Sequence, residues 1–124
     1  MDSEQLYKQA TAFEAKKDFA SALPIYKQIT SNSDDPRFFI AFGRCLQKLG
    51  HWKQSVAPLE KGIALKPHYC EGDARLFLAE SYLKIGKTKQ AIAQWHHVAK
   101  MKPEYPSYEA VPKEAKKMLA QYAK

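Results

Sequence analysis

The sequence is short of the residues on which several functional classes depend. Its 124 residues include two cysteines, five glycines and three arginines. The two cysteines, Cys45 and Cys70, allow at most one disulfide, and their places in a helical pattern and in a connection favour reduced thiols. The low glycine content excludes a fibrous chain, and 45% hydrophobic residues indicate a globular protein rather than a disordered one.

Long hydrophobic runs are also missing. No apolar run approaches the roughly 20 residues that a membrane-spanning helix requires. The first five residues lack the basic and then apolar order of a signal peptide. We therefore expect a cytoplasmic protein, unless a presequence has been removed. The length suits one domain with a real core and is too short for two of ordinary size.

The motifs of catalysis and metal binding are absent. We find no glycine-rich phosphate loop, no nucleophile elbow and no evident acid pair in an apolar pocket, so we expect no enzyme activity. His68 lies near Cys70, and His96 adjoins His97, but helix neighbours point about 100° apart and ligand spacings such as CxxC or HExxH are lacking. The sequence therefore predicts neither a metal site nor a cofactor.

What the sequence does contain is an internal repeat. Residues 50–67 and 86–103 share a glycine turn, a helix with small and large apolar residues in fixed places, and a closing Lys-Pro pair. A fainter copy begins at Lys17. Aligning Lys17 with Gly50 and Gly86 gives spacings of 33 and 36 residues, and a longer connection at 68–72 explains the difference. This period is typical of helical repeat arrays.

Helical stripes fill the intervals between the turns. Ser3 and Asp18 are suited to cap the first two helices, and Pro24 is expected near the first turn of its helix. Gly43 marks a place where another helix comes close. The expected core stripes are Leu6, Ala10 and Phe13; Ala22, Tyr26 and Ile29; Phe39, Phe42, Gly43 and Leu46; Val56, Leu59, Gly62 and Ile63; Leu78, Ala79 and Tyr82; and Ala91, Trp95 and Val98.

The repeated pattern resembles the tetratricopeptide repeat family, which has two helices and about 34 residues per repeat. The resemblance covers about residues 3 to 103, with departures at Gln9, Asp34, Ser55 and Arg75. It rests on small residues at Ala10, Gly43, Ala79, Ala22 and Ala91, on large ones at Phe13, Leu46, Tyr82, Tyr26, Leu59 and Trp95, and on closing prolines at Pro67 and Pro103.

The resemblance implies an all-α fold, a right-handed superhelical stack of antiparallel helix pairs with about seven helices. We expect one domain over residues 1–124, with repeats at about 3–35, 36–71 and 72–105. A last helix at about 111–123 has an apolar side and a lysine side, and we expect it to cap the apolar end of the array.

The resemblance also implies a non-catalytic protein-interaction module or adaptor. Its first helices would line a concave groove that binds a peptide or helix of another protein. The groove positions would be Tyr7, Thr11, Glu14, Arg37, Ile40, Arg44, Lys48, Asp73, Leu76, Glu80 and Lys84. The clamp that some members use for the carboxylate end of heat-shock chaperones is not expected. The corresponding places, Tyr7, Thr11, Ala41, Asp73 and Phe77, lack the required cations.

The net charge of +7 leaves two alternatives open. Residues 1–35 carry a net charge of −2, residues 36–71 and 72–103 carry +4 each, and residues 104–124 carry +1. This basic excess permits an acidic protein partner or a nucleic acid, although the lysines are dispersed and arginines are few. The other alternative is a scaffold that associates with itself. The sequence does not identify the partner.

Overall fold

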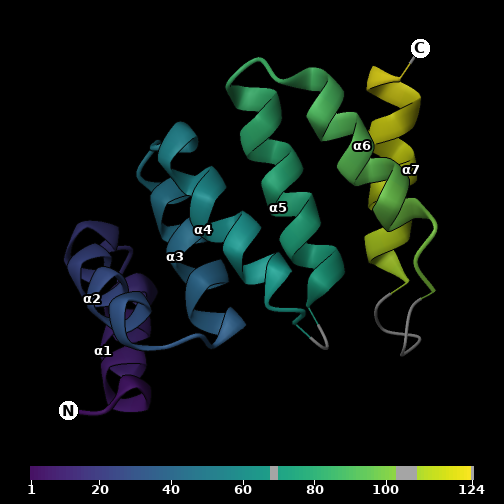
Figure 1. Ribbon diagram of the computed structural model, residues 1–124. Helices are drawn as coiled ribbons and strands as arrows, with labels where there is room; N and C mark the ends of the chain where they lie inside the picture. The colour runs from purple at the N-terminus through teal and green to yellow at the C-terminus, as the bar shows by residue number, and fades with distance from the viewer. Residues whose placement is uncertain (68–69, 103–108, 124) are drawn as a thin grey trace.

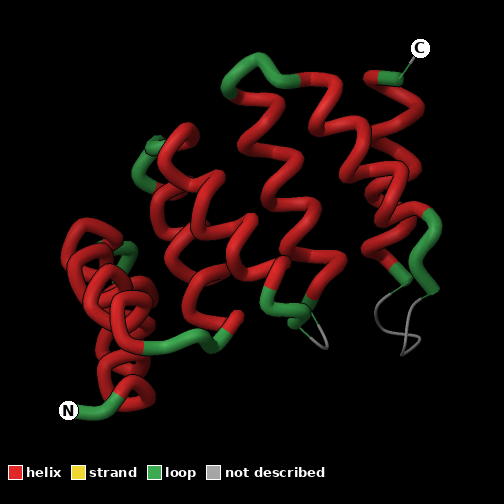
Figure 2. The backbone as a smooth tube through the Cα atoms, viewed as in Figure 1, coloured by secondary structure: helices red, strands yellow, loops and turns green. Residues whose placement is uncertain are grey.

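The protein is an array of helices. The computed structural model describes residues 1–67, 70–102 and 109–123, and across these ranges Figure 2 shows helices and loops without a strand. The helices are α1 (Ser3–Ala15), α2 (Phe19–Asn32), α3 (Pro36–Lys48), α4 (Trp52–Ala64), α5 (Glu71–Lys84), α6 (Thr88–Ala99) and α7 (Ala110–Tyr122). They follow one another from the N-terminal end of the molecule to the C-terminal end (Figure 1). The predicted all-α fold is confirmed.

The core consists of three clusters, and each joins a helix pair to the first helix of the next. The first cluster links α1, α2 and α3 through residues such as Ala10, Tyr26 and Phe38. The second links α3, α4 and α5, and the third links α5, α6 and α7. Each helix packs against the next, and α5 also contacts α3 and α7. Each repeat is therefore completed by its neighbour, as in other solenoids.

The three aligned turn residues share one backbone geometry. Lys17, Gly50 and Gly86 have positive φ angles of 61°, 81° and 82°. In each turn the following amide donates to the carbonyl five residues earlier, over 2.8–2.9 Å. This bond satisfies a carbonyl that the end of a helix would otherwise leave free. Alignment of the faint first copy with the two clear ones is thus confirmed, although Lys17 adopts a conformation that favours glycine.

Gly43 allows α3 and α4 to approach closely. A Cβ atom added to Gly43 would lie 2.5 Å from Cγ and 2.7 Å from Cδ2 of Leu59, which is fully buried. Real carbon atoms do not approach to these distances without a shift of one of them. The prediction that another helix crosses here is confirmed, and Leu59 of α4 is the residue that occupies the space.

Local signals were predicted with errors of a few residues. Asp18 caps α2 as expected, but α1 is capped by Asp2 rather than Ser3. The Asp2 carboxylate accepts the Gln5 amide at 2.8 Å while the Gln5 side chain accepts the Asp2 amide, which is a complete capping box. Pro24 lies in the second turn of α2, deeper than predicted.

Two core predictions were wrong. Phe13 is 37% exposed rather than buried. In α3, Phe38 is 2% exposed and packs in the first cluster, whereas the predicted Phe39 is only partly buried. Three consecutive large apolar residues at 38–40 place side chains all around the helix, so the periodicity cannot say which of them faces the core.

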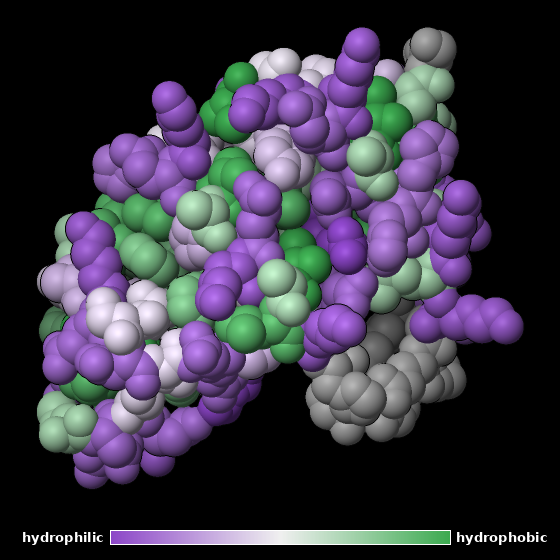
Figure 3. Space-filling model, in the orientation of Figure 1, coloured by the Kyte–Doolittle hydropathy of each residue, from purple (hydrophilic) through white to green (hydrophobic). Residues whose placement is uncertain are grey.

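The surface carries many charged side chains. On the side shown in Figure 3, hydrophilic side chains project from the array, with smaller apolar patches between them. Within the described ranges, no helix has both the length and the apolar character needed to cross a membrane. The first helices α1, α3 and α5, together with α7, hold the candidate site.

Candidate functional site

The first helices meet along one face, which we call the inner face and define by the contacts that join α1, α3, α5 and α7. At the α1–α3 junction the Tyr7 and Phe38 rings lie 5.1 Å apart between centroids. The Arg37 guanidinium lies 5.9 Å from the Tyr7 centroid and 5.1 Å from that of Phe38. It also donates to the carboxylates of Glu4 and Asp35. Arg37 therefore stabilises this junction through cation–π contacts and two ion pairs.

Arg44 makes the equivalent contact between α3 and α5. Its guanidinium carbon lies 4.1 Å from the centroid of the Phe77 ring, and its Nη1 lies 3.6 Å from Oε2 of Glu80. Nη1 also donates to Oε1 of Gln47 at 2.7 Å. The contact with Glu80 is longer than a hydrogen bond, so Arg44 is held by the ring and by Gln47 more firmly than by the carboxylate.

A buried polar network fixes Arg44 and Phe77 in place. Nε2 of Gln47 donates to the Phe77 carbonyl at 2.8 Å and to Oγ of Ser81 at 2.5 Å. Oγ of Ser81 lies 2.5 Å from Oγ of Ser55, which donates to the Trp52 carbonyl at 2.6 Å. Ser55 and Ser81 are fully buried. The network ties α3, α4 and α5 together and orients the side chain that supports Arg44.

The inner face continues into a cavity of about 410 Å³ between α5, α6 and α7, which we call the α5–α7 cavity. It is lined by Leu76, Phe77, Glu80, Leu83, Trp95, Glu114 and Met118. Trp95 of α6 is nearly buried, and its ring stacks on Tyr122 with centroids 5.5 Å apart. Five of the seven lining residues are apolar, so the cavity suits an apolar group.

Five of the residues predicted for the groove belong to the inner face or its cavity. They are Tyr7, Arg37, Arg44, Leu76 and Glu80. Partial burial raises the pKa of the Tyr7 hydroxyl, and the neighbouring Arg37 opposes this effect. The five residues lie on α1, α3 and α5, at the α1–α3 junction, at the α3–α5 junction and in the cavity.

Three predicted groove residues turn toward other helices. Ile40 is 8% exposed and packs against Leu59 in the second core cluster, so the prediction that it lines the groove is corrected. Glu14 accepts a hydrogen bond from the hydroxyl of Tyr26 in α2. Nζ of Lys84 lies 5.4 Å from the Trp52 ring centroid in α4. The resemblance to the repeat family implied that Ile40 lies in the groove with Arg37 and Arg44, whereas its side chain packs against α4.

The other three predicted residues are Thr11, Lys48 and Asp73. In the described part of the chain, none of them forms a hydrogen bond, ion pair or ring contact with another first helix. Thr11 is half-buried on α1, and its hydroxyl donates to the Lys8 carbonyl. Lys48 is exposed at the end of α3, and Asp73 is exposed in the first turn of α5. Desolvation raises the pKa of the Asp73 carboxyl above its ordinary range. Their part in binding stays a prediction.

The sequence reasoning missed six residues of the site: Phe38, Phe77, Leu83, Trp95, Glu114 and Met118. Trp95 and Met118 were assigned to packing, and α7 was expected only to cap the array. The repeat period could have identified Phe77. It follows Arg44 by about one repeat, and residues one period apart lie on neighbouring first helices, where they can contact each other.

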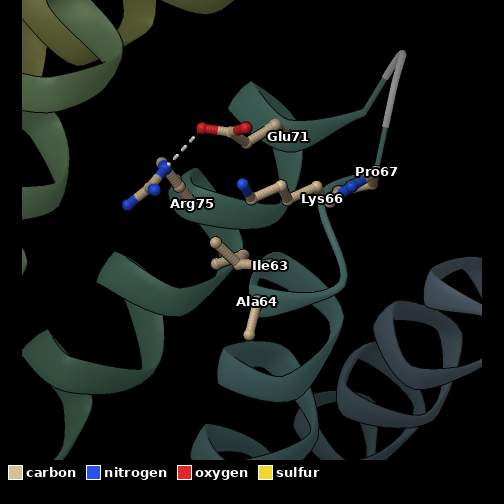
Figure 4. Close-up of a pocket in the computed structure, with 6 residues that line it drawn as sticks. All are labelled: Ile63, Ala64, Lys66, Pro67, Glu71 and Arg75. Atoms are coloured by element: carbon tan, nitrogen blue, oxygen red, sulfur yellow. Dashed lines mark hydrogen bonds and ion pairs between the residues drawn. The ribbon is translucent and has the colours of Figure 1, made fainter. Parts of the chain in front are cut away.

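A second cavity, of about 450 Å³, lies where α4 ends and α5 begins. Figure 4 shows the ion pair between Arg75 and Glu71, which lie one turn apart on α5, and Lys66 and Pro67 from the segment that follows α4. The Arg75 guanidinium donates to Glu71 at 3.0 Å and to Gln94 of α6 at 2.9 Å. Arg75 is thus engaged in holding α5 to α6.

No reactive group is apparent in the described part of the chain. Burial raises the pKa of the Cys45 thiol to about 11, and it also raises that of Cys70, so both thiols stay protonated near neutral pH. Within residues 1–67, 70–102 and 109–123 no three histidine, cysteine or acidic side chains are grouped to hold a metal ion.

All three arginines are engaged within the protein. Arg37 pairs with Glu4 and Asp35, Arg44 stacks on Phe77, and Arg75 pairs with Glu71. Arginines that read a nucleic acid must offer free donors to phosphates or base edges. The positive charge that remains comes from exposed lysines spread over several helices. This arrangement disfavours the nucleic-acid alternative.

Comparison with known proteins supports the repeat interpretation. Residues 6–35 match the tetratricopeptide repeat family model, so the match falls on the copy that is faintest to inspection. No curated protein sequence matches the chain.

Solved structures share the whole architecture. PcrH from Pseudomonas aeruginosa is 23% identical with a TM-score of 0.85, covering 98% of this chain and 92% of its own. PcrH in complex with the chaperone binding region of PopD is 23% identical, with a TM-score of 0.87 and coverage of 97% and 90%. SycD of Yersinia enterocolitica, in complex with a peptide of YopD, is 20% identical, with a TM-score of 0.86 and coverage of 97% and 91%. At these identities the likeness concerns the fold. Taken with the family match, it shows that the chain is built from tetratricopeptide-type repeats.

Proposed function

We propose that the protein is a non-catalytic adaptor or chaperone-like module whose inner face binds a segment of another protein. The observation that carries this proposal is a pair of arginine–aromatic contacts between neighbouring first helices. Arg37 lies beside Tyr7 at the α1–α3 junction, and Arg44 stacks on Phe77 at the α3–α5 junction. Phe77 also lines the apolar α5–α7 cavity. The inner face thus offers charged and aromatic groups at two places and a pocket for an apolar side chain beside the second.

The similar structures support this proposal. PcrH is described in complex with the chaperone binding regions of PopD and PopB, and SycD in complex with a peptide of YopD. Each is a protein of this fold holding a segment of another protein. We propose that this chain acts in the same general way, as one domain with the three repeats given above, without enzymatic activity and in the cytoplasm.

A site-specific crosslinking experiment tests the inner face directly. The photoreactive residue p-benzoylphenylalanine is placed at Thr11 or Asp73, and in matched controls at Gln28 of α2 or Gln90 of α6, which are exposed on second helices. We expect crosslinks to a defined segment of one partner from the first two positions and none to that segment from the controls. Equal crosslinking from all four positions would contradict the proposed site.

Charge reversal then measures the contribution of the face to affinity. Arg44→Glu combined with Lys48→Glu should weaken binding of the crosslinked segment at least tenfold, because it removes two cations from the inner face, including the guanidinium that stacks on Phe77. The control, Lys53→Glu combined with Lys89→Glu, makes the same charge change on exposed residues of α4 and α6. Circular dichroism checks that both variants keep their helices. Equal losses in both variants would indicate general charge attraction instead of an inner-face site.

A further inference from the structure

The α5–α7 cavity combines an apolar interior with a rim of one charge sign. Its ionisable lining residues are Glu80 of α5 and Glu114 of α7, and both are exposed. None of the described residues that line it is cationic. Arg44, on the inner face, lies 3.6 Å from Glu80 and is stacked on Phe77. The cavity therefore presents carboxylates to whatever enters it.

The size and lining of the cavity indicate what it can hold. A volume of about 410 Å³ falls in the range of about 300–1,000 Å³ that is usual for ligand pockets. Trp95 lines the cavity, and its ring stacks on Tyr122 of α7. With Leu76, Phe77, Leu83 and Met118 also in the lining, the cavity suits a large apolar side chain better than an extended polar one.

We propose that the α5–α7 cavity receives an apolar side chain of the partner segment, and that Glu80 and Glu114 select a basic residue next to it. This inference rests on the proposed function, and it gives the partner a definite chemistry. The net charge of +7 would by itself favour an acidic partner. The cavity favours a basic residue locally, because the carboxylates beside it attract cations and repel anions.

A matched pair of small molecules tests the cavity without any knowledge of the partner. 4-Phenylbutylamine and 4-phenylbutyrate have nearly the same shape and opposite charges at pH 7. Each is titrated into the full chain, and binding is followed through the indole N–H signals in ¹H–¹⁵N NMR spectra. Trp95 reports on the cavity, while Trp52, at the start of α4, is an internal control. We expect the amine to shift the Trp95 signal and to bind at least about fivefold more tightly than the carboxylate.

Variants separate charge selection from apolar filling. Glu80→Gln combined with Glu114→Gln should leave both molecules binding with similar affinity, while Glu60→Gln combined with Glu109→Gln removes two carboxylates that do not line the cavity and should keep the preference. Unchanged preference in the first variant would overturn the role of Glu80 and Glu114. No shift of the Trp95 signal at millimolar concentrations of either molecule would overturn the cavity as an apolar subsite.

The same measurements distinguish this inference from the proposed function. If Arg44→Glu with Lys48→Glu leaves partner binding intact while the amine preference is observed, the inner-face proposal fails and the cavity chemistry stands. A second outcome is that the partner segment binds the inner face, but its affinity changes neither with Glu80→Gln plus Glu114→Gln nor when the basic residue of the segment is replaced by glutamine. In that case the selection proposal fails and the proposed function stands.

Discussion

The close approach at Gly43 predicts that one substitution changes sign with its background. In the native chain, Gly43→Ala adds a methyl group 2.5 Å from Cγ of Leu59, in a core where Leu59 is fully buried. Overpacking of this kind costs about 1–3 kcal/mol. Alanine is favoured over glycine inside a helix by about 1 kcal/mol, which offsets part of the cost. We therefore expect the free energy of unfolding to fall by up to about 2 kcal/mol.

The background that removes the clash should reverse this effect. Leu59→Ala alone should lower the free energy of unfolding by about 2–5 kcal/mol, because it leaves a cavity between α3 and α4. In that variant Gly43→Ala fills part of the space and keeps the gain in helix propensity, so the double variant should be more stable than Leu59→Ala by about 1 kcal/mol. Urea unfolding followed by circular dichroism gives the four values of the cycle. An equal effect of Gly43→Ala in both backgrounds would refute the packing argument.

Two further predictions concern the ends of helices. Lys17→Gly should raise the free energy of unfolding by about 0.5–1 kcal/mol, because Lys17 has a φ of 61°, which glycine adopts without strain. The control, Lys16→Gly, changes a residue with a φ of −92° and should lower the free energy of unfolding. Thermal unfolding distinguishes the two. Hydrogen bonds from Arg37 hold the pKa of the Asp35 carboxyl below its ordinary value. The stability that Asp35 contributes is therefore fully present above the unfolded-state pKa. It is lost as the pH falls through the folded-state pKa. Asp35→Asn keeps a side-chain oxygen for the Arg37 amide but should reduce the loss of stability between about pH 5 and pH 2, which urea unfolding at several pH values would show. Equal slopes for the two proteins would contradict the assigned cause.

The fold was predictable because its signals recur. The turn at Lys17 resembles those at Gly50 and Gly86 only weakly in residue type, yet the common spacing aligned it correctly, and the three backbones agree. Small residues at fixed places predicted the contact between Gly43 and Leu59 in the same way. Repetition supplies several independent readings of one pattern, so an error in one copy is corrected by the others.

The site was less predictable because its contacts join different repeats. Arg37 meets Glu4, and the two are 33 residues apart, while Gln47 meets Ser81 at a separation of 34. A stripe drawn along one helix cannot show these pairs. It also misassigned Ile40, since side chains on one side of α3 divide between the inner face and α4. A search for complementary residues one period apart would have found the pairing of Arg37 with Glu4.

The two arginine junctions are expected to contribute differently to recognition. Arg37 donates to two carboxylates, which already offset its charge, and exposed pairs of this kind contribute only about 0–1 kcal/mol each. Within the described residues Arg44 has one carboxylate, at 3.6 Å, and a ring beneath it. It can therefore donate to an additional acceptor without losing the contact that orients it. The half of the inner face from Arg44 to the α5–α7 cavity is therefore where a partner can gain most. It is also where a cation on the partner would meet Glu80 and Glu114, and where discrimination between partner segments should be concentrated.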